Sequence, residues 1–163
     1  MLFLSEAMNS FSTDSYWRSV HRETVDDLAA VNYPSLPAGF NRLVDRIFRE
    51  AIEEVLRELP SGRAFEIGCG RGRWMRLLRG RGWVAHGCDI ALSARPSVVA
   101  SELAVPIRSR SCNLVLAITV LQHIREKEFV LDEIFRILEP GGHVLLVEIL
   151  ERPGGHLAGA YVS

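Results

Sequence analysis

Three alternating glycines with an acidic residue on either side form the stretch of this sequence that is best suited to bind a ligand. Gly68, Gly70 and Gly72 follow a short apolar run, and a helical pattern begins directly after them. Glycine adopts positive φ at little cost and carries no Cβ, so a ligand can lie close to the backbone. A glycine turn between a strand and a helix N-terminus is where nucleotide-like ligands bind in open α/β sheets. The flanking acidic residues are Glu66 and Asp89.

The position of Asp89 limits which kind of nucleotide-like ligand the glycine turn is expected to bind. Asp89 follows Gly68 by 21 positions and comes at the predicted end of the next strand. A carboxylate at that place can accept hydrogen bonds from both hydroxyls of a ribose. A nicotinamide-binding G-x-G-x-x-G pattern would need a third glycine at position 73, which is Arg73. The stretch therefore favours a different nucleoside ligand, with a plain tight turn as the alternative.

Short apolar strands alternate with helices from residue 63 onward, which is typical of a parallel sheet with crossover helices. We predict strands at residues 64–67, 83–88, 97–101, 114–119 and 143–149, and helices at 40–59, 72–79 and 126–138. The fold class is α/β, with a Rossmann-like, doubly wound and mostly parallel sheet. Residues 1–39 are expected to form an N-terminal helical cap or lid, with a helix over 13–28. Residues 40–163 are expected to form the ligand-binding domain, in a chain that is one domain overall.

The predicted lid is rich in aromatic side chains. An aromatic cage there could hold an amine substrate by cation–π contact, and the alternative is that these residues are the packing face of a helix. The candidate substrate residues are Tyr16, Trp17, His21 and Tyr33.

Composition and charge exclude several classes of protein. The formal net charge over 163 residues is −1, so we expect neither DNA nor a membrane as partner. The arginines at 71, 73, 76, 79 and 81 fit a solvated helix face better than an RNA site. Three cysteines without a Cys-x-x-Cys pair indicate no disulfide framework and no metal site. We therefore expect a cytoplasmic protein, since the N-terminus also lacks the pattern of a signal peptide.

Five stretches in order resemble the class I S-adenosylmethionine-dependent methyltransferases, in their small-molecule, methyltransferase type 11-like branch. Residues 66–72 match the family's E/D-x-G-x-G-x-G motif, and Asp89 matches the acidic residue that ends strand two. The other three stretches are residues 103–115, 121–124 and 133–142.

The resemblance implies strand order 3-2-1-4-5 and transfer of a methyl group to an N or O nucleophile of a small molecule. It implies S-adenosylmethionine as cofactor and S-adenosylhomocysteine as product. His123 is a candidate general base, or else a packing residue beside the cofactor. The cofactor-binding residues that the resemblance implies are Glu66, Gly68, Cys69, Gly70, Gly72, Asp89, Ile90, Ser101, Glu102, Ala117 and Ile118.

The sequence departs from the family pattern at three places. Ser101, with Glu102 beside it, stands where an acidic residue usually meets the adenine, and Cys112-Asn113 replaces a Phe-Asp pair. Residues 151–163 are predicted to be loop-like, without the family's C-terminal hairpin of strands six and seven. Strand five would then be an open edge, which a homodimer or another partner would cover. Ser101 and the missing hairpin keep open a non-catalytic or degenerate domain that acts through a partner. An RNA or protein methyltransferase is a minor alternative.

Overall fold

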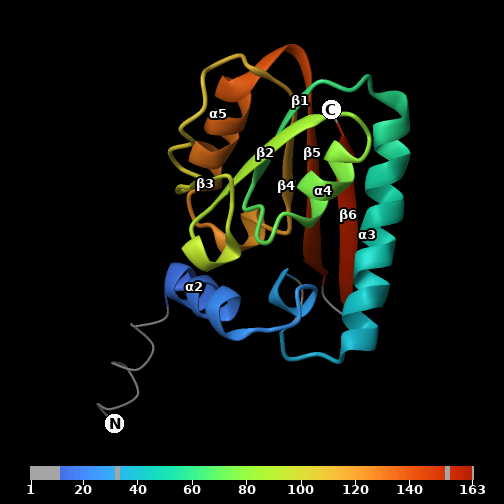
Figure 1. The fold of residues 1–163 in the computed structure, drawn as a ribbon, viewed down its shortest axis with the longest axis vertical. Helices are drawn as coiled ribbons and strands as arrows, with labels where there is room; N and C mark the ends of the chain where they lie inside the picture. Colours follow the sequence, from blue (N-terminus) through green and yellow to red (C-terminus); the bar gives the residue numbers. More distant parts are fainter. Residues whose placement is uncertain (1–11, 32–33, 153–154, 163) are drawn as a thin grey trace.

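The computed structural model of the protein describes residues 12–31, 34–152 and 155–162. These residues form a six-stranded sheet of order β3-β2-β1-β4-β5-β6 with helices on both faces (Figure 1). All neighbouring strands are parallel except β6, which is antiparallel to β5. The predicted Rossmann-like fold and its strand order 3-2-1-4-5 are therefore confirmed.

The elements follow the predicted alternation closely. The strands are β1 Arg63–Ile67, β2 Val84–Asp89, β3 Val98–Val99, β4 Cys112–Ile118, β5 Leu138–Arg152 and β6 Gly155–Val162. The α-helices are α2 Thr13–Glu23, α3 Ala38–Glu58, α4 Arg73–Arg79 and α5 Lys127–Ile137, and the 3-10 helices are η1 Ala29–Val31, η2 Leu92–Ala94 and η3 Leu121–His123. The third strand is shorter than predicted, and α2 ends five residues earlier, because Thr24 already has extended backbone.

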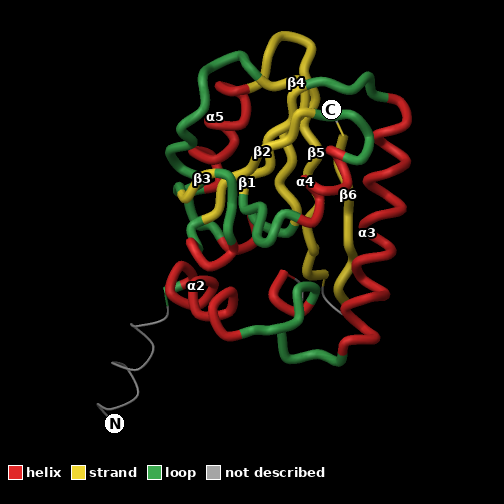
Figure 2. The backbone as a smooth tube through the Cα atoms, viewed as in Figure 1, coloured by secondary structure: helices red, strands yellow, loops and turns green. Residues whose placement is uncertain are grey.

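The strands of the sheet lie between helices (Figure 2), and an apolar layer covers each face of the sheet. On one face, Phe48 and Ile52 of α3 and Trp74 of α4 pack with Leu114 and Leu116. Successive strand residues point to opposite faces, so the alternate residues of β4 pack on the other side against α5. The sheet is buried on both faces, which explains why its central strands are almost wholly apolar.

The C-terminal segment differs from the prediction of a loop. β5 runs on to Arg152, and β6 pairs with it from Leu145↔Val162 to Arg152↔Gly155. Pro153-Gly154-Gly155 was the signal for a loop, but a short Pro/Gly stretch equally marks the reversal between two paired strands. One antiparallel strand therefore follows β5, and the outer edge of β5 is paired within the chain. This pairing removes the reason for expecting a homodimer or another partner at that edge.

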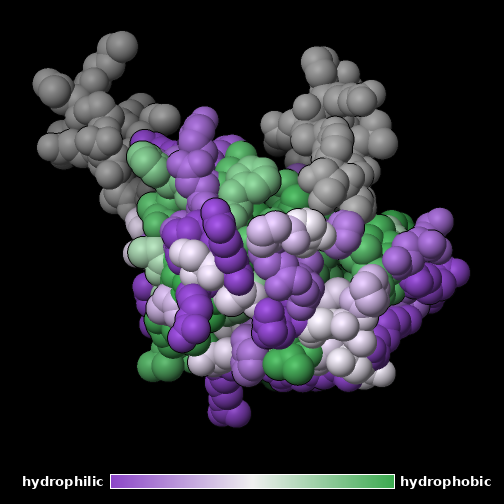
Figure 3. All heavy atoms as spheres, turned by 90° about the horizontal axis from the view of Figure 1, so that it is seen from above, coloured by the Kyte–Doolittle hydropathy of each residue, from purple (hydrophilic) through white to green (hydrophobic). Residues whose placement is uncertain are grey.

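The described part of the chain contains no helix both long and apolar enough to cross a bilayer. On the face seen in Figure 3, hydrophilic residues interrupt the apolar ones.

Candidate active site

The carboxyl ends of β1, β2 and β4 border a cavity with about 800 Å³ of empty space, open solvent included, and residues of the helix α2 also line it. The structure brings together eleven of the sequence-predicted site residues in the wall of this cavity. From the sheet and its loops these are Glu66, Gly68, Cys69, Gly70, Asp89, Ile90, Glu102, Ile118 and His123, and from α2 they are Trp17 and His21.

Four predicted site residues do not line the cavity. Gly72 is the N-cap of α4, and Ala117 is buried in the apolar layer on the α5 side of the sheet. The hydroxyl of Ser101 is exposed and accepts a hydrogen bond of 3.2 Å from the backbone N–H of Leu103. Tyr16 lies edge-on to Trp17 on the outside of α2. Tyr33 lies outside the described residues.

The glycine turn has the backbone conformation that its composition predicts. Gly68 and Gly70 have φ of +63° and +48°. A Cβ on Gly68 would lie 2.4 Å from Cγ2 of Val120, which belongs to the loop after β4. The turn therefore needs glycine both for its φ and for this close approach. Two loops that are distant in sequence form one continuous floor of the cavity as a result.

Asp89 is held in one orientation by two backbone groups. Its Oδ2 accepts a hydrogen bond of 2.8 Å from the N–H of Gly70, and its Oδ1 accepts one of 2.8 Å from the N–H of Ala91. The side chain is buried at the cavity wall. A carboxylate oxygen has two lone pairs, so both oxygens can still accept a hydrogen bond from a ligand.

Glu66 is a buried carboxyl group with an unsatisfied oxygen. Its Oε2 has no hydrogen-bond partner among the described residues. Burial raises the pKa of Glu66 to about 8, although the charge of Arg73 and a hydrogen bond from the backbone of Met75 oppose the shift. A cationic ligand group in the cavity would satisfy this carboxylate. The ammonium of an amino-acid moiety, such as that of S-adenosylmethionine, fits this requirement.

Arg73 is a cavity residue that the sequence did not reveal. It is 8% exposed, forms an ion pair of 2.9 Å with Asp45 of α3, and lies 4.4 Å above the ring of Trp74. The prediction of a solvated arginine face is thus wrong for Arg73, because α3 covers this side of α4. Regular spacing alone does not say which side of a short helix another element covers.

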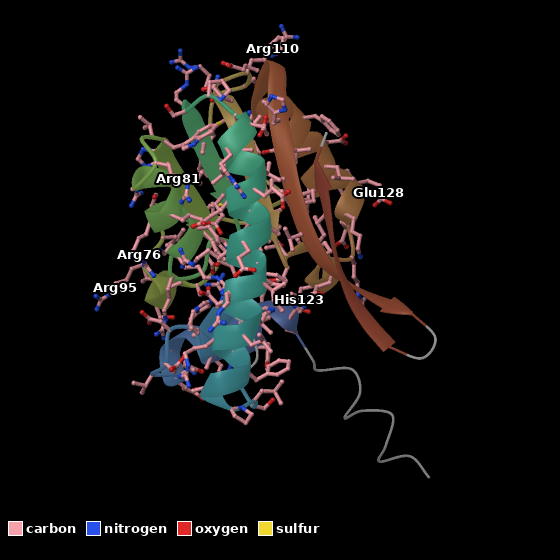
Figure 4. The ribbon with its side chains drawn as sticks, turned by 90° about the vertical axis from the view of Figure 1, so that its right-hand side faces the viewer. Arg76, Arg81, Arg95, Arg110, His123 and Glu128 are labelled. Atoms are coloured by element: carbon pink, nitrogen blue, oxygen red, sulfur yellow. The ribbon has the colours of Figure 1, made fainter. Side chains whose placement is uncertain are left out.

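His123 closes the cavity from the side of β4. Figure 4 shows it next to α2, and its ring centroid lies 4.9 Å from that of Trp17 in an edge-to-face arrangement. Burial lowers the pKa of His123, so the ring is neutral at physiological pH. Its Nε2 lies 3.1 Å from Nε2 of Gln122.

The remaining cavity residues gave no signal in the sequence. Thr119 is one of them, and its φ of +57° is unusual for a β-branched residue. Such backbone strain often marks functional sites, but it becomes visible only in the fold. The others are Thr13, Asp14, Trp74, Cys88, Ala100, Val120 and Ile124. Across the residues that the structure describes, no group of three or more metal-ligating side chains occurs.

Comparison with known proteins agrees with this geometry. The family model for a methyltransferase domain matches residues 40–160, which is more than half of the chain. The tRNA (carboxymethyluridine(34)-5-O)-methyltransferase of Mus musculus is 34% identical over 107 residues, covering 58% of this chain and 16% of that protein. The 24-methylenesterol C-methyltransferase 2 of Oryza sativa is 28% identical over 126 residues, covering 67% of this chain and 35% of that protein. The chain thus spans well under two thirds of the length of these relatives.

Among solved structures, a Methanococcus maripaludis protein described as an S-adenosyl-L-methionine-dependent methyltransferase matches with a TM-score of 0.59. It is 17% identical and the match covers 85% of this chain and 65% of that one, which supports the fold. The chain therefore belongs to the class I S-adenosylmethionine-dependent methyltransferase family, and S-adenosylmethionine is its cofactor.

Proposed function

We propose that this chain binds S-adenosylmethionine in the cavity and transfers its methyl group to an N or O nucleophile of a small molecule. The observation that carries the proposal is the pair of buried carboxyl groups, Glu66 and Asp89, on either side of the glycine turn. Oε2 of Glu66 has no hydrogen-bond partner among the described residues, and both oxygens of Asp89 are held in place by backbone N–H groups.

Each part of the wall then has a binding role. When bound, S-adenosylmethionine supplies an electrophilic methyl group on a sulfonium centre. Glu66 holds the ammonium, Asp89 accepts from the ribose hydroxyls, and the glycine turn lets the amino-acid part lie against bare backbone. Ile90, Glu102 and Ile118 line the remaining wall and are assigned to the adenine side.

The acceptor that this cavity favours is small and not anionic. The empty space of about 800 Å³, which includes open solvent, has to hold the cofactor and the acceptor together, so the acceptor must be small. Asp14 and Glu102 also line it, and their negative charges would repel a phosphate. Burial raises the pKa of Glu102, and the nearby charges of Asp14 and Asp89 add to this rise.

Transfer depends mainly on orientation and exclusion of water, which α2 provides by lying over the cavity. His123 is neutral and can take a proton from the acceptor. In the alternative role it only packs against Trp17 and closes the cavity. We assign residues 1–39 to the lid and residues 40–163 to the catalytic domain. Because the three cysteines are free, we assign the protein to the cytoplasm.

A second candidate acceptor is a tRNA nucleoside. The identity of 34% to a tRNA methyltransferase favours it, and the acidic cavity residues oppose it. The two acceptors are distinguished by supplying transfer RNA in the same assay as the small molecules.

The proposal is tested by calorimetry with S-adenosylmethionine, followed by transfer of a labelled methyl group to amines, phenols, carboxylates and total tRNA. We expect binding by the wild-type protein, greatly weakened binding by Asp89→Ala, and labelling of a small molecule. Asp132→Asn, an exposed change on α5, is the matched control. Absence of binding would contradict the cofactor assignment. Binding without transfer to any acceptor would favour the non-catalytic alternative.

A further inference from the structure

His21 is a buried polar side chain whose hydrogen bonding is incomplete. It lies on α2, is 5% exposed, and lines the cavity. Its Nδ1 is buried without a hydrogen-bond partner among the described residues. A buried nitrogen without a partner is costly, so its satisfaction by a ligand would favour binding.

The surroundings of His21 define what that ligand group must be. Burial lowers the pKa of His21, and the charge of Arg71 adds to this, while nearby Asp89 opposes it. The imidazole is therefore neutral, with one nitrogen that donates and one that accepts. Asp89, as a carboxylate, can only accept. A hydroxyl can donate to Asp89 and accept from His21 at once when Nδ1 of His21 carries the proton, whereas an ammonium can only donate.

Arg71 of the glycine turn fixes α2, and with it His21, above the cavity. Its Nη2 donates to the backbone carbonyls of His21 at 3.0 Å and Thr24 at 2.5 Å. Its Nη1 donates to the carbonyl of Val25 at 3.3 Å and to Oδ1 of Asp27 at 2.5 Å. The last carbonyls of a helix lack intrahelical partners, and here a guanidinium from the cofactor loop satisfies them. Arg71 therefore joins the cofactor loop directly to the end of α2.

A second contact holds the other part of α2. The ring of Trp17, one helical turn before His21, packs edge-to-face on His123. Arg71 therefore bonds α2 at the carbonyl of His21, and His123 contacts the same helix at Trp17, one turn earlier.

We infer that His21 is a cofactor-binding residue supplied by the lid, and that it clamps the ribose hydroxyls of the cofactor together with Asp89. The inference rests on the proposed function and adds a residue to its binding site. It makes α2 part of the cofactor site as well as a cover for the acceptor.

The test compares ligands that differ in one hydroxyl. Calorimetry measures the affinity of the wild-type protein and of His21→Phe for S-adenosylhomocysteine and for its 2′-deoxy and 3′-deoxy analogues. Phenylalanine fills similar space without a nitrogen. We expect removal of one of the two hydroxyls to weaken binding to both proteins. The fold-loss of affinity should be about 5 to 10 times larger for the wild-type protein than for His21→Phe, which corresponds to one hydrogen bond.

Arg18→Gln, an exposed change on the same helix, is the matched control and should behave as wild type. Equal weakening of all three ligands by His21→Phe would mean a structural role and would overturn the inference, while the proposed function would stand. Failure of the wild-type protein to bind S-adenosylhomocysteine at all would overturn both.

A second measurement needs no variant, in case His21→Phe does not fold. The imidazole ¹⁵N shifts of His21 in the wild-type protein should change when S-adenosylhomocysteine is added. They should change less with the deoxy analogue that lacks the hydroxyl bonded to His21. Shifts that respond identically to all three ligands would contradict a hydrogen bond from His21 to the ribose.

Discussion

The backbone N–H of Gly70 donates a hydrogen bond of 2.8 Å to Oδ2 of Asp89, so the residue that ends β2 also holds the glycine turn. Its other oxygen holds Ala91 in the same way. Because both donors are backbone groups of cavity loops, the shape of the cavity and the orientation of the carboxylate depend on each other. Changes at Asp89 should therefore affect stability and ligand affinity together.

Asp89→Asn tests this dual role. An amide NH₂ would face one of the two backbone N–H groups, and a donor facing a donor leaves both unsatisfied. We expect a loss of about 1–3 kcal/mol in the free energy of unfolding and an affinity for S-adenosylmethionine lower by about tenfold or more. Denaturant unfolding and calorimetry measure the two effects. Unchanged affinity in a destabilised protein would show that Asp89 acts on structure alone.

Glu66 should make the stability of the ligand-free protein depend on pH. Its pKa is about 8 in the folded protein and 4.5 in the reference state, so between these values the folded state binds more protons. The contribution of Glu66 to stability is therefore full below pH 4.5 and declines as the pH rises towards 8, with a slope of up to about 1.4 kcal/mol per pH unit. The stability of Glu66→Gln relative to wild type should rise over this window. Parallel stability curves for the two proteins would contradict the raised pKa.

Cofactor binding should release a proton from Glu66. A bound ammonium favours the carboxylate form, so a group that is largely protonated below pH 8 must lose its proton on binding. We expect the wild-type affinity to increase from pH 6 to pH 8 and the affinity of Glu66→Gln to change less. Calorimetry in buffers of different ionisation enthalpy counts the released proton directly.

Arg71→Ala should loosen α2 while the sheet stays folded. The variant loses the four hydrogen bonds that join the glycine turn to the end of α2. We expect hydrogen exchange of the α2 amides to accelerate by about tenfold or more, since local opening becomes easier. Arg71→Lys should be intermediate because an ammonium cannot reproduce the planar fork. Arg125→Ala, at an exposed position outside the lid, controls for loss of charge. Equal α2 exchange in Arg71→Ala and wild type would show that other contacts hold the lid.

Glu148→Ala should disturb the loop that carries His123. The carboxylate of Glu148 accepts hydrogen bonds from the backbone N–H groups of Val120, Leu121 and Gln122, at 3.1, 2.8 and 3.2 Å. Their loss should lower the free energy of unfolding by about 2–4 kcal/mol, because three backbone donors, two of them partly buried, lose a charged acceptor. Urea unfolding measures this effect. Glu128→Gln is the control, since Figure 4 shows Glu128 pointing away from the fold. A change below 0.5 kcal/mol would contradict the role of Glu148.

Much of the sheet and of the cofactor loop could be predicted because each signal is local. Apolar runs of strand length, a glycine turn and an acidic residue at the end of the next strand lie within a few residues of the structure they produce. The pairing of β6 with β5 could not be predicted in this way. A segment after a Pro-Gly-Gly stretch becomes a strand only when a neighbouring edge offers backbone partners.

The same distinction applies to the cavity. The sequence by itself indicated the alternation of strands and helices, the positive φ of the glycine turn, and the carboxyl groups of Glu66 and Asp89 as ligand-binding candidates, and the family resemblance implied the strand order. The tertiary structure alone decided that Arg73 is buried by α3, that Arg71 holds α2, and that Nδ1 of His21, without a hydrogen-bond partner among the described residues, lies in the cavity that Asp89 also lines. Backbone conformation follows from residues that are adjacent in the chain, whereas burial and hydrogen-bond partners depend on elements that folding brings together from distant parts of it.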